Sequence, residues 1–156
     1  MSARLARWIA TWFGCGYAPV GPGTVGSLAA VLIAWALAHW AAWPPLAIGA
    51  LGVVAAAPAI WAADVTVHAT GKKDPGIVVV DEVVGQWITF AGATAIGWAT
   101  VIAAFILFRL FDIWKPPPVR QMEQLPGGVG VVLDDVFAGV YAAVLLFMIS
   151  RLLIRH

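Results

Sequence analysis

The sequence predicts an all-α protein in which several helices cross a membrane as a bundle. Of its 156 residues, 62% are hydrophobic and only 11% are charged. Several apolar runs approach the ~20 residues that a spanning helix needs. The length suits one domain, which we expect to cover residues 1–156. The formal net charge of +1 gives no electrostatic reason to expect nucleic acid as a partner.

The first predicted element is an amphipathic helix at the N-terminus. Arg4 and Arg7 lie outside its apolar stripe, which suits a helix that lies in the membrane interface. A helix packed into the protein core is the alternative. The stripe follows the i, i+3, i+4, i+7, i+8 spacing of one helical face and consists of Leu5, Trp8, Ile9, Trp12 and Phe13.

Three long apolar runs predict spanning helices. A glycine-rich break at residues 21–27 precedes the first run, from Leu28 to Trp43. Two prolines separate it from the second run, Leu46 to Ala63, and the last run extends from Val136 to Ile154. Each run approaches the length that spanning a bilayer requires.

The stretch from Val83 to Phe111 has two interpretations. As one tilted helix it would place the acidic residues at its two ends on opposite sides of the membrane. As two short helices that turn near Gly92 to Gly97, it returns both ends to one side. We favour this hairpin of short helices around residues 83–111, because a shared site requires an even number of crossings between the acidic residues.

Acidic residues gather in three clusters at the edges of the apolar runs. Ionised carboxylates near a bilayer are normally paired, bound to a metal or placed at the interface. Their hard oxygens favour Mg²⁺ or Mn²⁺, and we expect Mg²⁺. Alternatively, the two adjacent pairs cap helices that begin there. The expected metal ligands are Asp81, Glu82, Asp134 and Asp135, with Asp112 as a further ligand or the catalytic base.

Cations around Asp112 predict a phosphate site. Arg109 and Lys115 stand three residues before and after it, so one helix end can present all three to a common pocket. Two basic side chains beside one acidic side chain leave a net positive charge that can bind a phosphate. The turn at residues 21–27 adds backbone N–H groups at a helix start. The expected phosphate-binding residues are Thr24, Ser27, Lys73, Arg109 and Lys115.

Five motifs spread over residues 19–139 carry a resemblance to a known family. They are Pro19–Ser27, Gly71–Pro75, Val80–Glu82 with Gly85 and Trp87, Phe108–Pro116, and Gly127–Gly130 with the following Asp134-Asp135 and Ala138-Gly139. Together, and in this order, they resemble the bacterial phosphatidylglycerophosphatase A family. The resemblance implies a Mg²⁺-dependent membrane phosphatase that converts phosphatidylglycerophosphate to phosphatidylglycerol. It does not assign roles to individual residues.

The alternative function is a small ion- or proton-coupled carrier that uses the acidic clusters as a pathway. A lipid head-group transferase lacks support, because the D-G-x₂-A-R signature is missing. The distribution of cations favours an active site on the cytoplasmic side, and the resemblance implies the bacterial inner membrane. The cations expected on the active-site side are Arg4, Arg7, Lys72, Lys73, Lys115 and Arg120, and those opposite are Arg151 and Arg155.

Overall fold

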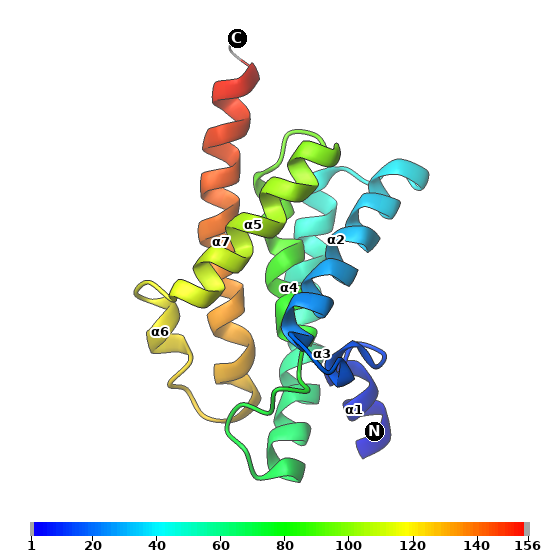
Figure 1. Cartoon of the computed structure of the whole chain (residues 1–156), viewed down its shortest axis with the longest axis vertical. Helices are drawn as coiled ribbons and strands as arrows, with labels where there is room; N and C mark the ends of the chain where they lie inside the picture. Colours follow the sequence, from blue (N-terminus) through cyan, green and yellow to red (C-terminus); the bar gives the residue numbers. More distant parts are fainter. Residues whose placement is uncertain (1, 155–156) are drawn as a thin grey trace.

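The computed structural model of the chain describes residues 2–154 and the side chains of residues 2–152. Within that range the chain is helical and forms no strand, which confirms the predicted all-α class (Figure 1). Its helices are α1 (Ala3–Ala10), α2 (Pro22–Trp40), α3 (Pro45–Thr70), α4 (Val80–Thr89), α5 (Trp98–Trp114), α6 (Val119–Met122) and α7 (Gly127–Ile154), with short 3₁₀ turns η1 (Cys15–Tyr17) and η2 (Phe90–Gly92).

Among the described residues, three helices are long and apolar enough to cross a membrane, as predicted. They are α2, α3 and most of α7, Gly127–Leu152. Large apolar side chains such as Leu32, Val53 and Val144 are exposed on these helices, as expected for surfaces that face lipid. A proline occupies the first turn of both α2 and α3, where it has no hydrogen bond to lose.

The short helix α4 lies at the centre of the bundle. It packs against α2, α3 and α7, and nine of its ten residues are buried. The indole Nε1 of Trp87 donates a hydrogen bond to the Ala30 carbonyl of α2 over 3.0 Å. The chain then turns through η2 and residues 93–97 into α5, which confirms the predicted hairpin. Phe90 and Gly92 are buried in this turn, whereas Thr94, Ala95 and Gly97 are exposed.

Gly85 allows α4, α5 and α7 to approach one another. A Cβ at this position would lie 2.5 Å from the Asp135 carbonyl oxygen and would overlap the Phe108 ring. Gly85→Ala is therefore expected to destabilise the protein by about 1–3 kcal/mol through overpacking. Thermal unfolding in detergent measures this effect. Gly97→Ala is the matched control, because a Cβ at Gly97 has no heavy atom within 4 Å. Equal melting temperatures for the two variants would contradict the prediction.

The start of α7 corrects a sequence prediction. The final helix was expected to begin near Val136, with Asp134-Asp135 at its start, but it begins at Gly127. The carboxylate of Asp64 on α3 accepts a hydrogen bond from the Gly128 N–H over 3.0 Å, and a Cβ at Gly128 would overlap the α3 backbone. The glycines thus serve helix packing rather than a loop. The acidic pair lies two turns inside α7, so it does not cap the helix.

The predicted N-terminal helix is present as α1. It lies against α3 through Ala6 and Ala10, both fully buried, while Trp8 is exposed. In Figure 1, α1 lies at the same end of the bundle as the beginning of α2 and the end of α3. The predicted apolar stripe is thus divided: Ile9 and Trp12 are half-buried and pack against the core, whereas Leu5, Trp8 and Phe13 are exposed.

Candidate active site

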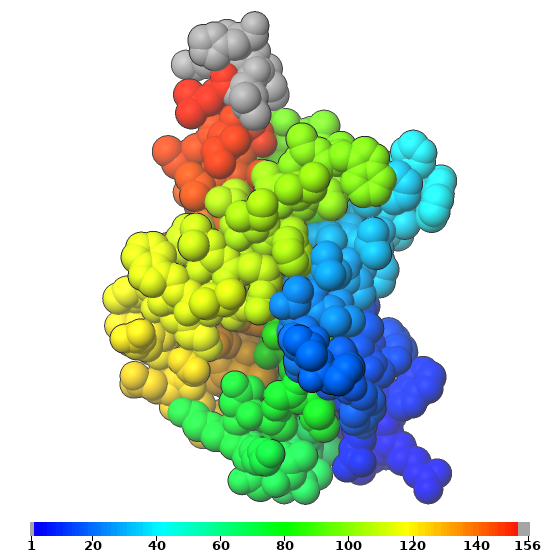
Figure 2. All heavy atoms as spheres, viewed as in Figure 1, coloured from blue at the N-terminus to red at the C-terminus, as the bar shows by residue number. Residues whose placement is uncertain are grey.

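All three acidic clusters line one cavity of about 360 Å³, although they are separated in sequence by up to 54 residues, from position 81 to position 135. In Figure 2 the segments that line it, coloured blue, green and yellow, meet in the lower half of the view. Seven of the chain's eight acidic residues line the cavity, together with three basic residues. The lining groups are Asp74, Asp81, Glu82, Asp112, Glu123, Asp134, Asp135, Lys73, Arg109 and Lys115.

Three carboxylates form a compact group at the base of the pocket. Asp81 and Glu82 come from the first turn of α4, and Asp135 comes from α7. One oxygen from each lies within 4.8 Å of the others. Asp81 Oδ1 and Glu82 Oε2 are buried without a hydrogen-bond partner among the described residues. Three ionised carboxylates this close together repel one another unless a cation lies between them or one of them is protonated, and their hard oxygens fit the ligand preference of Mg²⁺.

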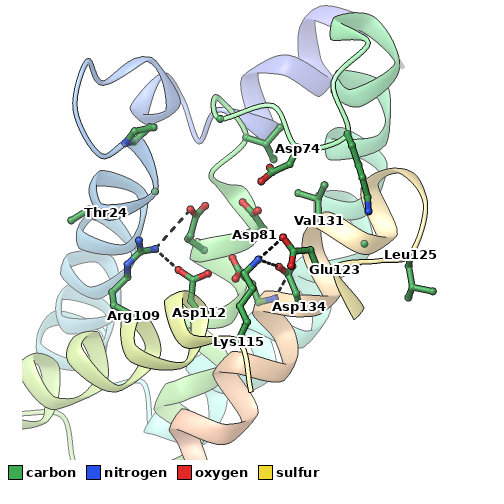
Figure 3. A pocket seen from close by; sticks show the side chains of 18 of the residues that line it. Thr24, Asp74, Asp81, Arg109, Asp112, Lys115, Glu123, Leu125, Val131 and Asp134 are labelled. Atoms are coloured by element: carbon green, nitrogen blue, oxygen red, sulfur yellow. Dashed lines mark hydrogen bonds and ion pairs between the residues drawn. The ribbon is translucent and has the colours of Figure 1, made fainter. Parts of the chain in front are cut away.

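Asp134 faces a different group from its neighbour Asp135. Its Oδ2 accepts a hydrogen bond from Lys115 Nζ over 2.7 Å, and Glu123 Oε1 lies 3.1 Å from the same nitrogen (Figure 3). Adjacent residues on a helix point about 100° apart. Asp135 therefore faces the carboxylates of Asp81 and Glu82, while Asp134 faces Lys115. The structure thus brings three of the four predicted metal ligands together and directs the fourth to Lys115.

Lys115 remains charged in this position. Burial alone would lower the pKa of its ammonium group, but hydrogen bonds and opposite charge from Asp134, and then from Glu123, outweigh burial and raise the pKa above its ordinary value. Lys115 ends α5 with a left-handed backbone, φ 50°. Its side chain therefore leaves the helical face that Arg109 and Asp112 share, and it reaches α7.

Arg109 lies between Asp112 and Glu82, and Glu82 belongs to the group of three carboxylates. Its Nη1 lies 2.6 Å from Asp112 Oδ2 and 3.9 Å from Glu82 Oε1 (Figure 3). The three side chains are each at most 20% exposed. A guanidinium has five donors, so these two contacts leave others available to an oxyanion in the pocket.

The N-terminal end of α2 forms another wall. Thr24 lines the pocket, and a Cβ at Gly23 would displace the carboxylate of Glu82. Lys73 also lines the pocket. Ser27, also predicted to bind phosphate, is fully buried and is not among the residues that line the pocket. It lies one helical turn beyond Thr24, and that turn is enclosed by the bundle.

Sequence reasoning missed residues that the fold brings to the site. Glu123 follows α6 and contacts Lys115, while Asp74 lies in the loop before α4, so helical spacing could place neither. Gln86 is fully buried one turn beyond Glu82, and both of its amide atoms lack a hydrogen-bond partner among the described residues. A glutamine inside an otherwise apolar run is a signal that could have marked it, although Gln86 is not among the residues that line the pocket.

Comparison with known proteins shows what this chain is similar to. A protein of Escherichia coli (strain K12) named phosphatidylglycerophosphatase A is 36% identical over 145 residues, covering 92% of this chain and 82% of that protein. A Haemophilus influenzae protein of the same name is 35% identical over 151 residues, covering 91% and 86%. A Bacteroides thetaiotaomicron protein named "Putative phosphatidylinositol-3-phosphatase" is 46% identical over 142 residues, covering 88% and 89%.

No solved structure matches the chain. The family model described as phosphatidylglycerophosphatase A matches residues 8–150, which include every residue of the acidic pocket. The chain therefore belongs to the phosphatidylglycerophosphatase A family of phosphoric monoester hydrolases.

Proposed function

We propose that this chain hydrolyses the terminal phosphate of phosphatidylglycerophosphate to give phosphatidylglycerol and inorganic phosphate, with Mg²⁺ as its cofactor. The observation that carries the proposal is the pocket, where seven acidic residues and three cations meet at one end of a bundle of membrane-length helices. Family membership and the names of the two phosphatidylglycerophosphatase A relatives support this substrate. The same family favours a hydrolase over the alternative carrier.

The proposed metal ligands are Asp81, Glu82 and Asp135, with Asp134 beside them. A bound Mg²⁺ polarises phosphoryl oxygens and lowers the pKa of a coordinated water. In the net reaction, water bonds to phosphorus, the bond from phosphorus to the glycerol oxygen breaks, and that oxygen takes up a proton. Asp134 accepts a hydrogen bond from Lys115, so its proposed role is to hold that ammonium group at the pocket wall.

The proposed phosphate-binding groups are Arg109 and Lys115, with Lys73 and Thr24 at the rim. Asp112 orients the Arg109 guanidinium through the 2.6 Å contact. The positive groups stabilise charge on the phosphoryl oxygens as the bond to the leaving oxygen breaks. Since Lys115 already contacts two carboxylates, Arg109 is expected to make the larger contribution to phosphate binding.

A phosphatidylinositol phosphate is the second candidate substrate. The Bacteroides thetaiotaomicron relative named for that activity is 46% identical to this chain. Both candidate lipids carry a phosphomonoester on a polyol attached to a glycerophospholipid. The chemistry proposed for the pocket acts on this shared group, so the two candidates differ only in how the polyol fits.

The proposed location is the bacterial inner membrane, with the pocket open to the cytoplasm. Lys72, Lys73 and Arg120 lie in or beside the loops at the pocket end of the bundle, whereas Arg151 lies near the far end of α7. Arg155, which was also expected at the far end, lies outside the described residues. Positively charged loops favour the cytoplasmic side of a membrane.

Release of inorganic phosphate by the purified full-length protein tests the proposal. Phosphatidylglycerophosphate and phosphatidylinositol 3-phosphate are compared in the same detergent micelles. We expect release from phosphatidylglycerophosphate to stop with EDTA and to return with Mg²⁺. A higher kcat/KM on the inositol lipid would replace the proposed substrate by the second candidate. No release from either lipid by folded protein would contradict the proposed function.

A further inference from the structure

A second cavity lies on the N-terminal segment and shares no lining residue with the acidic pocket. Its volume is about 290 Å³. Its lining combines two guanidinium groups with three aromatic rings, from Arg4, Arg7, Trp8, Phe13 and Tyr17. In Figure 2 this segment, in dark blue, forms part of the surface at the lower right.

The two arginines carry charge that no carboxylate of the described residues neutralises. They stand three residues apart on α1, and both are exposed. The chain contains no acidic residue before Asp64, and the ion pairs found among the described residues all involve other groups. Two adjacent guanidinium groups without a carboxylate favour an anionic ligand, and their planar donors suit phosphate oxygens.

The turn after α1 holds an aromatic ring at the edge of this cavity. Trp12 and Phe13 have left-handed backbones, with φ of 46° and 54°, a conformation that non-glycine residues adopt only when the surroundings impose it. The Phe13 N–H donates to the Trp8 carbonyl over 2.9 Å, and the two rings meet edge to face with centroids 5.6 Å apart. Trp8 and Phe13 are nevertheless 63% and 62% exposed.

The cavity lies at the pocket end of the bundle. The Val79 N–H, just before α4, donates to the Ala10 carbonyl of α1 over 2.8 Å. The segment that carries Arg4, Trp8 and Phe13 is thereby fixed beside the helix that supplies Asp81 and Glu82. Exposed aromatic rings with basic residues next to them are typical of a surface in the membrane interface.

We propose that Arg4 and Arg7 bind the phosphate of an anionic glycerophospholipid from the surrounding bilayer, while Trp8, Phe13 and Tyr17 contact its glycerol and upper acyl chains. A soluble anion would use the guanidinium groups alone and would leave the three rings in water. The combination of unpaired cations with exposed aromatic rings fits a ligand that has a charged end and an apolar end. This site is independent of the proposed phosphatase reaction.

Native mass spectrometry of the delipidated full-length protein tests the site. Phosphatidylserine is the probe because it is anionic but has no phosphomonoester, and phosphatidylcholine is the comparison. We expect the wild type to bind phosphatidylserine more tightly, and the double variant Arg4→Gln/Arg7→Gln to raise its dissociation constant about tenfold or more, because charge-assisted hydrogen bonds are lost. A melting temperature in detergent equal to that of the wild type shows that this variant is folded.

The matched control is Arg120→Gln/Arg151→Gln, which removes the same charge elsewhere, and it should bind phosphatidylserine like the wild type. Trp8→Ala should also weaken phosphatidylserine binding, although the net charge is unchanged. An equal loss in the control would show general charge attraction and overturn the site. Equal binding of the two lipids, or displacement of phosphatidylserine by inorganic phosphate at a similar concentration, would overturn it as well.

Discussion

Asp135→Asn is expected to lower phosphate release by about 10²-fold or more at limiting Mg²⁺. Asp135 supplies one of three carboxylate oxygens that lie within 4.8 Å of one another. Asparagine keeps the size of the side chain but removes the charge that would hold a divalent cation. Asp81→Asn should act in the same direction, because Asp81 belongs to the same group and is equally enclosed. Initial rates over a range of Mg²⁺ concentrations measure the effect.

The stability of the same variants separates a metal ligand from a structural residue. Without metal, removing one of three carboxylates that repel one another should leave the melting temperature unchanged or raise it. Adding Mg²⁺ should stabilise the wild type by mass action and the variants much less. Asp64→Asn is the control, since Asp64 lies outside the pocket and an amide oxygen can still accept from Gly128. A similar loss of rate in the control would contradict the assignment.

Arg109→Lys is expected to lower kcat/KM on the order of 10²-fold. Lysine keeps the positive charge beside Asp112 and Glu82, so folding should be preserved. It loses the planar donors that can contact a carboxylate and a phosphate together. The matched control is Arg120→Lys, at an exposed position of α6, which should retain the wild-type rate. Wild-type kinetics in Arg109→Lys would show that Arg109 only balances buried charge.

Much of the fold could be predicted because lipid imposes a strong pattern. Apolar runs of spanning length predicted α2, α3 and α7, and the positions of the acidic residues favoured the turn between α4 and α5. The start of α7 could not be predicted in this way. Glycine lowers helix propensity, so Gly127-Gly128 suggested a loop. Only the contact of Gly128 with α3 and its hydrogen bond to Asp64 explain why the helix begins there.

The sequence predicted only part of the site, because it does not specify contacts between helices. Residues that share one helix can be related by their spacing, and this brought Arg109 and Asp112 together correctly. Contacts between helices do not follow from spacing. The Lys115 contact with Asp134 and Glu123 requires the left-handed end of α5, and the burial of Ser27 requires the packing around α2. Neither feature has a local signal in the sequence.

Metal binding is the most direct test of the proposed site, because every proposed role depends on the three carboxylates of Asp81, Glu82 and Asp135. Electron paramagnetic resonance follows free Mn²⁺, a substitute for Mg²⁺, as purified protein is added. We expect the wild type and Asp64→Asn to bind Mn²⁺ in competition with Mg²⁺, and Asp81→Asn/Asp135→Asn not to bind it. Binding by the double variant with wild-type affinity would contradict the metal site formed by Asp81, Glu82 and Asp135.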